Sequence, residues 1–123
     1  MATVQLTQES FESTVANNDI VLIDFWASWC APCRMFAPVY EAASETHDDI
    51  VFAKVDTEAE QELAAGFGIM SIPTLMAFRD QVLLYAQPGA LPSAALEDLI
   101  GKVKALDMDE VRKSIAEQAP AQA

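Results

Sequence analysis

The stretch that decides the fold is Phe25-Trp26-Ala27-Ser28-Trp29-Cys30-Ala31-Pro32-Cys33, which holds both cysteines of the chain. A nearly continuous apolar run over residues 20–26 leads into it and predicts a strand that is buried on both faces of a sheet. A helical pattern follows over about 33–46, and we expect a kink at Pro38 because proline removes one backbone hydrogen bond. A C-x-x-C pair between a strand and a helix predicts a disulfide that closes and opens reversibly.

Two other interpretations of the cysteine pair stay open at this point. The cysteines could be inert packing residues, or they could bind a metal ion. Because the chain has only two cysteines, a four-cysteine zinc site and a scaffold of several disulfides are excluded. The spacing and its flanks favour redox chemistry, and we expect no metal site.

The composition fits one soluble domain. The chain has 123 residues, of which 52% are hydrophobic and 21% are charged, so it can form a packed core. It shows no apolar run long enough to span a membrane, and its first residues lack the pattern of a secretory signal. We therefore expect a cytoplasmic protein without membrane contacts, in a compartment that keeps structural disulfides rare.

The charge is strongly acidic, at −12. Such a chain repels phosphate backbones, so we do not expect nucleic acid as a partner. The charge mainly predicts a well-solvated surface, and electrostatic steering toward basic partner proteins is the more specific alternative.

The hydrophobic pattern predicts an α/β fold with a central mixed sheet and helices on both faces. The predicted strands cover residues 4–6, 20–26, 51–56, 74–79 and 82–86, and the predicted helices cover about 10–16, 33–46, 58–65 and 93–106. A helical extension follows, in which Asp107 can cap a short helix and Glu110 can complete a capping box. We expect residues 118–123 to form a disordered tail. The extension is either a loosely docked surface helix or an element that binds a partner.

The position of each cysteine predicts a different role. Cys30 falls where the strand and loop meet the start of the helix, and there the helix dipole and free amides favour a thiolate. We expect the Cys30 sulfur to be exposed and to attack, and Cys33, one turn further along, to be less exposed and to resolve the mixed disulfide. Pro32 fits the first helical turn because its missing N–H is not needed there.

A carboxylate inside the apolar strand is the second chemical feature. Burial should raise the pKa of Asp24 and let it exchange protons near neutral pH. Lys54, on another apolar strand, is the expected buried or half-buried partner, and together they could take the proton of Cys33. The alternative is an exposed Asp24 and Lys54 with no catalytic part. His47, the only histidine, is expected to be a solvated surface residue.

Pro73 opens the predicted strand 74–79, where proline marks a tight turn whose peptide bond can be cis or trans. Here the residues resemble the thioredoxin family. The resemblance covers about residues 3–104 and rests on several motifs in order: Val21 to Met35 around the cysteines, Phe36-Ala37-Pro38, Ala53-Lys54-Val55-Asp56, Gly68-Ile69-Met70-Ser71-Ile72-Pro73-Thr74 and Pro88-Gly89-Ala90-Leu91. It implies a thioredoxin fold, with a thioredoxin domain over 1–106 and an extension over 107–123.

The resemblance also implies the site and the function. Cys30 would attack, Cys33 would resolve, Asp24 with Lys54 would accept the proton, and Pro73 would be cis. Clients would dock on an apolar patch formed by Trp29, Ala31, Pro32, Ile72, Pro73, Gly89 and Ala90. The implied activity is reduction of protein disulfides by a monomer that binds no cofactor, with electrons supplied by a thioredoxin reductase that uses NADPH and a flavin. The alternative is a redox-modulated binding or chaperone-partner module on the same fold.

The sequence departs from the family pattern at the active site. Ala31 stands where the family usually has glycine, Arg34 replaces the usual lysine, and the turn Asp80-Gln81 lacks the usual glycine. Retention of Pro32 favours a reductant, because oxidising relatives often carry histidine there. The added methyl group of Ala31 is the change most able to alter the redox potential or the choice of partner.

Overall fold

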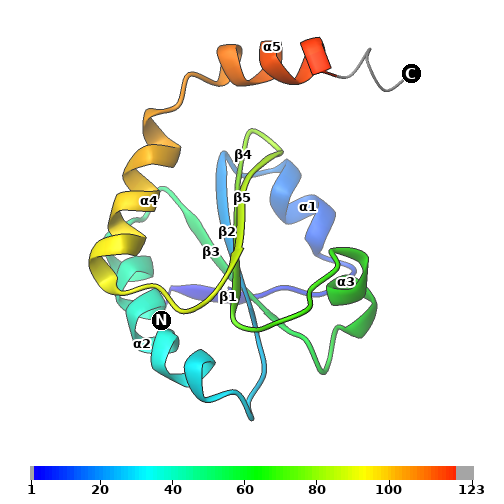
Figure 1. Ribbon diagram of the computed structural model, residues 1–123, viewed down its shortest axis with the longest axis vertical. Helices are drawn as coiled ribbons and strands as arrows, with labels where there is room; N and C mark the ends of the chain where they lie inside the picture. The colour runs from blue at the N-terminus through cyan, green and yellow to red at the C-terminus, as the bar shows by residue number, and fades with distance from the viewer. Residues whose placement is uncertain (1, 119–123) are drawn as a thin grey trace.

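A five-stranded sheet runs through the centre of the protein and carries helices on both faces (Figure 1). The structure is a computed structural model that describes residues 2–118. Its elements are β1 Thr3–Gln5, α1 Phe11–Ala16, β2 Ile20–Trp26, α2 Ala31–Thr46, β3 Val51–Asp56, α3 Gln61–Gly66, β4 Thr74–Arg79, β5 Val82–Pro88, α4 Ser93–Ala105 and α5 Met108–Gln118. The predicted order of elements and the mixed sheet are confirmed.

The strand order is β1-β3-β2-β4-β5, which places β2 in the middle. β2 pairs in parallel with β3 and antiparallel with β4, and β5 completes a hairpin with β4. Every residue of β2 except Trp26 is buried, which agrees with its continuous apolar sequence. The strand that leads to the cysteines is therefore the most enclosed strand of the sheet.

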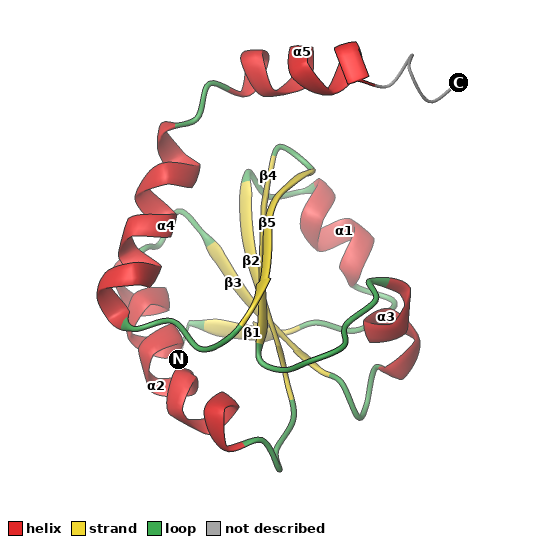
Figure 2. Cartoon of the chain, in the orientation of Figure 1, coloured by secondary structure: helices red, strands yellow, loops and turns green. Residues whose placement is uncertain are grey.

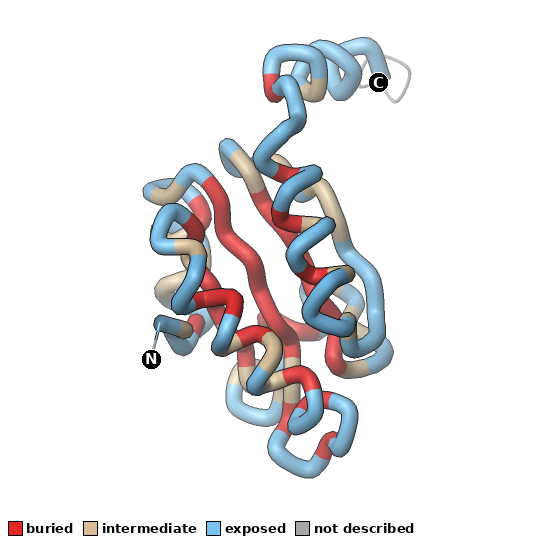
Figure 3. Tube along the Cα trace, turned by 90° about the vertical axis from the view of Figure 1, so that its left-hand side faces the viewer, coloured by how far each residue is buried: buried red, intermediate tan, exposed pale blue. Residues whose placement is uncertain are grey.

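Helices lie on both faces of the sheet (Figure 2). Two clusters of buried apolar side chains fill the space between the sheet and these helices. On one face, α2 and α4 pack on the sheet through Tyr40, Phe52 and Leu96. On the other face, α1 and α3 cover Ile23 and Phe25. Figure 3 shows the buried residues following the strands and the inner sides of the helices. Successive residues of β2 thus pack into different clusters, with Leu22 on the α2 and α4 face and Ile23 on the α1 and α3 face.

The helix α3 begins later than the sequence predicts, at Gln61 rather than residue 58. The carboxylate of Asp56 accepts the N–H groups of Glu58 and Ala59, at 2.9 and 3.4 Å. These bonds hold residues 57–59 in a turn, because the short side chain of aspartate competes with helical bonding. Thr57 and Glu58 of this turn line a groove together with Trp29.

The extension forms α5, which begins with the predicted cap. The Asp107 carboxylate accepts the N–H groups of Asp109 and Glu110, at 3.0 and 3.3 Å. Met108 is buried, and Arg112 pairs with Asp80 in the β4–β5 turn at 3.2 Å. The predicted disordered tail lies outside the described residues, apart from Gln118, which ends α5. Within residues 2–118 the longest helices are too short or too polar to cross a bilayer.

His47 differs from its prediction as a solvated residue. It ends α2, is half-buried, and lies stacked on Phe52. Its Nε2 lies 2.7 Å from a carboxylate oxygen of Glu97, and the Lys104 ammonium lies 3.4 Å from its Nδ1. The prediction was wrong because α4 folds back over the end of α2, a long-range contact that local sequence does not reveal.

Candidate active site

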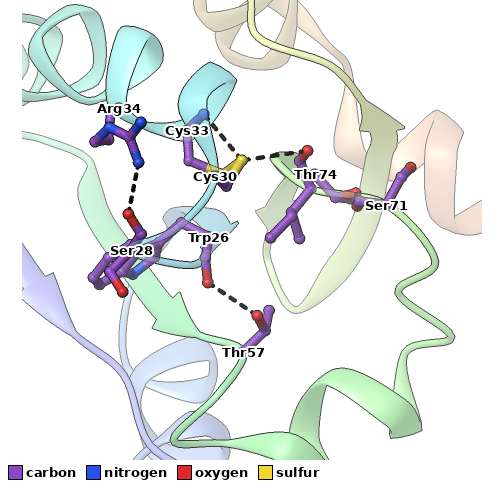
Figure 4. The surroundings of a disulfide bond; sticks show 9 residues. Trp26, Ser28, Cys30, Cys33, Arg34, Thr57, Ser71 and Thr74 are labelled. Atoms are coloured by element: carbon purple, nitrogen blue, oxygen red, sulfur yellow. Dashed lines mark hydrogen bonds between the residues drawn. A yellow bond between two sulfur atoms is a disulfide. The ribbon is translucent and has the colours of Figure 1, made fainter.

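The site lies where β2 ends and α2 begins (Figure 4). The carbonyl oxygen of Trp26, the last residue of β2, accepts both the N–H and the hydroxyl of Thr57, at 2.9 and 3.1 Å. The Cys30 N–H donates to Ala27 at 3.2 Å and closes the loop between strand and helix. These bonds attach the cysteine loop to the end of the central sheet.

Cys30 and Cys33 form a disulfide, with their Cα atoms 5.2 Å apart. Cys30 is the N-cap of α2, and its sulfur accepts the Cys33 N–H at 3.2 Å. Ala31 and Pro32 fill the first turn, where the missing proline N–H leaves no helical bond unmade. The Cys30 sulfur thus lies where a helix N-terminus and the Cys33 N–H that it accepts favour negative charge.

The predicted difference in exposure between the cysteines is wrong. Cys30 is 4% exposed and Cys33 is 3% exposed in the disulfide form. Both side chains pack with Ala27 and against Trp26 and Ile72. What distinguishes them is position, because Cys30 caps the helix while Cys33 lies inside it.

Asp24 is buried in the middle of β2, with only 1% of its surface exposed. Both of its carboxylate oxygens lack a hydrogen-bond partner among the residues that the structure describes. Burial raises the pKa of Asp24 from 3.8 to about 7, and the positive charge of Lys54 lowers it by less. The predicted burial and raised pKa are therefore present, and the alternative of an exposed Asp24 does not hold.

Lys54 lies beside Asp24 in the register of the parallel strands β2 and β3. It is half-buried, and its ammonium lies 4.8 Å from the centre of the Trp26 ring. No ion pair within 4.0 Å joins Lys54 to Asp24 in the described chain. The two groups therefore interact through charge at a distance, with the ammonium held over an aromatic face.

The loop before β4 brings a second segment to the disulfide. The Ile72–Pro73 peptide bond is cis, as the resemblance implied. The carbonyl oxygen of Ile72 lies 3.7 Å from the Cys30 sulfur. The Gly89 N–H donates to the Pro73 carbonyl at 2.8 Å, and Gly89 has a φ of 112° that side chains rarely adopt. The loop before β4 thus lies against the cysteine pair, and Gly89 attaches the end of β5 to that loop.

The residues expected to dock clients surround the disulfide and are mostly exposed. Trp29 is 66% exposed, and Ala31, Pro32, Gly89 and Ala90 are also exposed. Ile72 is half-buried. Pro73 is buried, so it supports the loop and does not present an exposed surface to a client.

Sequence reasoning missed two exposed methionines near the site and the backbone contact that Arg34 makes. Met70 and Met35 are 94% and 75% exposed, although methionine is usually buried. Arg34 donates from its guanidinium to the Ser28 carbonyl at 2.8 Å, which holds the loop that carries Trp29. Met35 could have been noticed, because it lies off the face of α2 that Phe36 and Tyr40 define. Met70 sits in a loop, where no periodicity marks it.

The family model for thioredoxin matches residues 2–102. The chain belongs to the thioredoxin family. A protein of Streptomyces coelicolor named "Putative thioredoxin 2" is 64% identical over 117 residues, which cover 95% of this chain and 87% of that protein. Bacillus subtilis thioredoxin is 42% identical over 103 residues, covering 83% of this chain and 98% of the relative.

A solved structure of a mutant thioredoxin from Halobacterium salinarum has a TM-score of 0.78 and 35% identity, over 85% of this chain and 92% of that one. The family, the fold and the C-x-x-C pair make this protein a thiol–disulfide oxidoreductase. These comparisons do not support the alternative of a binding module. Among residues 2–118, no group of three or more His, Cys, Asp and Glu side chains is placed to hold a metal ion.

Proposed function

We propose that this oxidoreductase reduces disulfides of client proteins, with Cys30 as nucleophile and Cys33 as resolving cysteine. The Cys30 thiolate attacks one client sulfur, a Cys30–client disulfide forms, and the other client sulfur leaves as a thiolate. Cys33 then attacks the Cys30 sulfur, the intramolecular disulfide forms, and the second client thiolate leaves. Two electrons pass from the dithiol to the client. The observation that carries this assignment is the Cys33 N–H directed at the Cys30 sulfur at the start of α2.

Asp24 is proposed as the group that takes the Cys33 proton. Its pKa of about 7 lets it accept a proton near neutral pH, while Lys54 favours its charged form. Proton acceptance at Asp24 makes Cys33 a thiolate when the mixed disulfide needs resolving.

Clients are proposed to dock on the exposed patch around the disulfide, and their backbone to pair with Ile72 in the manner of an added strand. Support comes from the exposed apolar surface of Trp29 and from the closeness of the Ile72 carbonyl to Cys30. Pro73 and Gly89 hold this edge in place through their backbone hydrogen bond.

The cycle requires a source of electrons. A thioredoxin reductase that uses NADPH and a flavin is proposed to return the disulfide to the dithiol, in the cytoplasm, so no bound cofactor is needed on this chain. The same proposal includes three further points. The protein is a monomer, it divides into a domain over 1–106 and an extension over 107–123, and it takes part in electron transport.

The test is insulin reduction coupled to NADPH and a thioredoxin reductase. The wild type should turn over, Cys30→Ser should lose activity, and Cys33→Ser should accumulate a mixed disulfide visible by mass spectrometry. Asp24→Asn should slow resolution of the mixed disulfide by roughly 100-fold at pH 7, the scale of a positioned proton acceptor. Normal turnover by Cys30→Ser would overturn the mechanism.

A further inference from the structure

A groove of about 460 Å³ lies beside the disulfide, between the Trp29 loop, α3 and the loop before β4. Trp29 and Met70 line the groove, and both present large exposed apolar surfaces. Ala64, Ala65 and Ile69 add small and branched apolar groups. Such a groove has ample room for a bulky apolar side chain.

The rim of the groove is acidic. Glu58 lines it, and the segment that carries Glu58 also contains Asp56, Glu60 and Glu62. No lysine or arginine occurs among the described residues that line the groove. The guanidinium of Arg34 is directed to the Ser28 carbonyl. The rim therefore favours a positive charge on whatever occupies the groove.

The groove is connected to the reacting sulfur through Ile72. Ile72 lines the groove, and its carbonyl oxygen lies 3.7 Å from the Cys30 sulfur. Thr57, which also lines the groove, is hydrogen-bonded to the end of β2. An extended peptide advances about 3.3 Å per residue, so a side chain within two residues of a client cysteine reaches the groove.

From these observations we propose that the groove selects clients that carry a bulky apolar residue within two positions of the reactive cysteine and a lysine or arginine next to it. The apolar side chain packs between Trp29 and Met70, and the basic side chain pairs with Glu58. This inference rests on the proposed reduction of client disulfides and names the kind of client that is reduced fastest.

The experiment compares two disulfide-linked peptides that share a leucine beside the cysteine and differ in a flanking lysine or glutamate. At about 20 mM salt, the dithiol protein should reduce the lysine peptide roughly five- to tenfold faster than the glutamate peptide. The reason is that the Glu58 carboxylate attracts the lysine side chain and repels the glutamate side chain. The ratio should fall toward about twofold at 1 M salt, where the Debye length is only ~3 Å. Replacing leucine with glycine should slow both peptides.

Glu58→Gln should reduce the preference to about twofold or less. Glu62→Gln is the matched control and should keep the preference, since Glu62 lines neighbouring grooves with Gln8 rather than this one. Equal rates for the two peptides with the wild type, or an unchanged ratio in Glu58→Gln, overturn the inference while leaving the reductase activity intact.

Binding of matched peptides with serine in place of cysteine gives a readout that does not depend on reduction. Chemical shifts at Trp29, Glu58 and Met70 should move more, and at lower concentration, with the lysine peptide. Failure of the proposed function would abolish reduction of both peptides, yet this binding preference would still decide the inference.

Discussion

Replacing Asp24 with asparagine should stabilise the disulfide form of the protein at neutral and alkaline pH. The carboxyl is buried without a hydrogen-bond partner in the described chain, and burial raises its pKa from 3.8 to about 7. One pKa unit corresponds to about 1.4 kcal/mol, so ionising the buried group costs about 4 kcal/mol of unfolding free energy. Asparagine has nearly the same shape and does not ionise.

The sign of the effect depends on pH. Below pH 3.8 the carboxyl is protonated in the folded and the unfolded chain, so the two proteins should have similar stability. Between pH 3.8 and about 7 the unfolded chain releases its proton while the folded protein keeps it, so the wild type loses stability relative to the variant. Above pH 7 the full difference of about 4 kcal/mol should persist.

Urea unfolding at pH 4, 5.5, 7 and 8.5, with the disulfide intact, measures this difference. Asp98→Asn is the control, because Asp98 is exposed and pairs with Lys102 on the same helix. Its effect should stay within about 0.5 kcal/mol at each pH. A gain for Asp24→Asn that does not change with pH, or that is absent at pH 8.5, would refute the assigned burial penalty.

Three further substitutions test other parts of the structure. Gln81→Gly should raise the free energy of unfolding by about 1 kcal/mol in urea titrations, because Gln81 has a φ of 69°, which glycine adopts without strain. Gln87→Gly is the control and should lower the free energy of unfolding, because Gln87 lies in the strand β5. Tyr40→Phe should cost about 1 kcal/mol in the same assay, since the buried hydroxyl donates to the Ala53 carbonyl at 2.8 Å; no loss would contradict that bond. Asp107→Ala should speed hydrogen exchange in the first turn of α5 without changing the global unfolding midpoint, and an unchanged exchange rate would contradict its role as a cap.

Much of the fold is visible in the sequence because the central strands are buried on both faces. β2, β3 and β4 occupy 20–26, 51–56 and 74–79, as predicted, and the prediction of β2 rested on its nearly continuous apolar run. β5 extends beyond its prediction to Pro88, since an edge strand is half-exposed and its end carries little pattern. The burial of Asp24 follows from its place inside such a run, and its raised pKa follows from burial.

The features that the sequence could not supply depend on contacts between distant segments. The near-equal burial of Cys30 and Cys33 arises from Ile72, which lies some forty residues further along the chain. His47 is half-buried because α4 returns over α2. Met70 becomes part of a groove only when α3 and the loop before β4 come together beside Trp29.

The link between Arg112 and Asp80 places α5 at the opposite end of the sheet from the disulfide (Figure 1). β2 alone, with seven residues, separates the two ends by about 20 Å. An affinity handle, a dye or a surface tether attached to α5 would leave the client-facing loops unobstructed. Immobilised copies oriented through α5 would all present Cys30 away from the support, which makes this protein suitable for trapping clients on a solid phase.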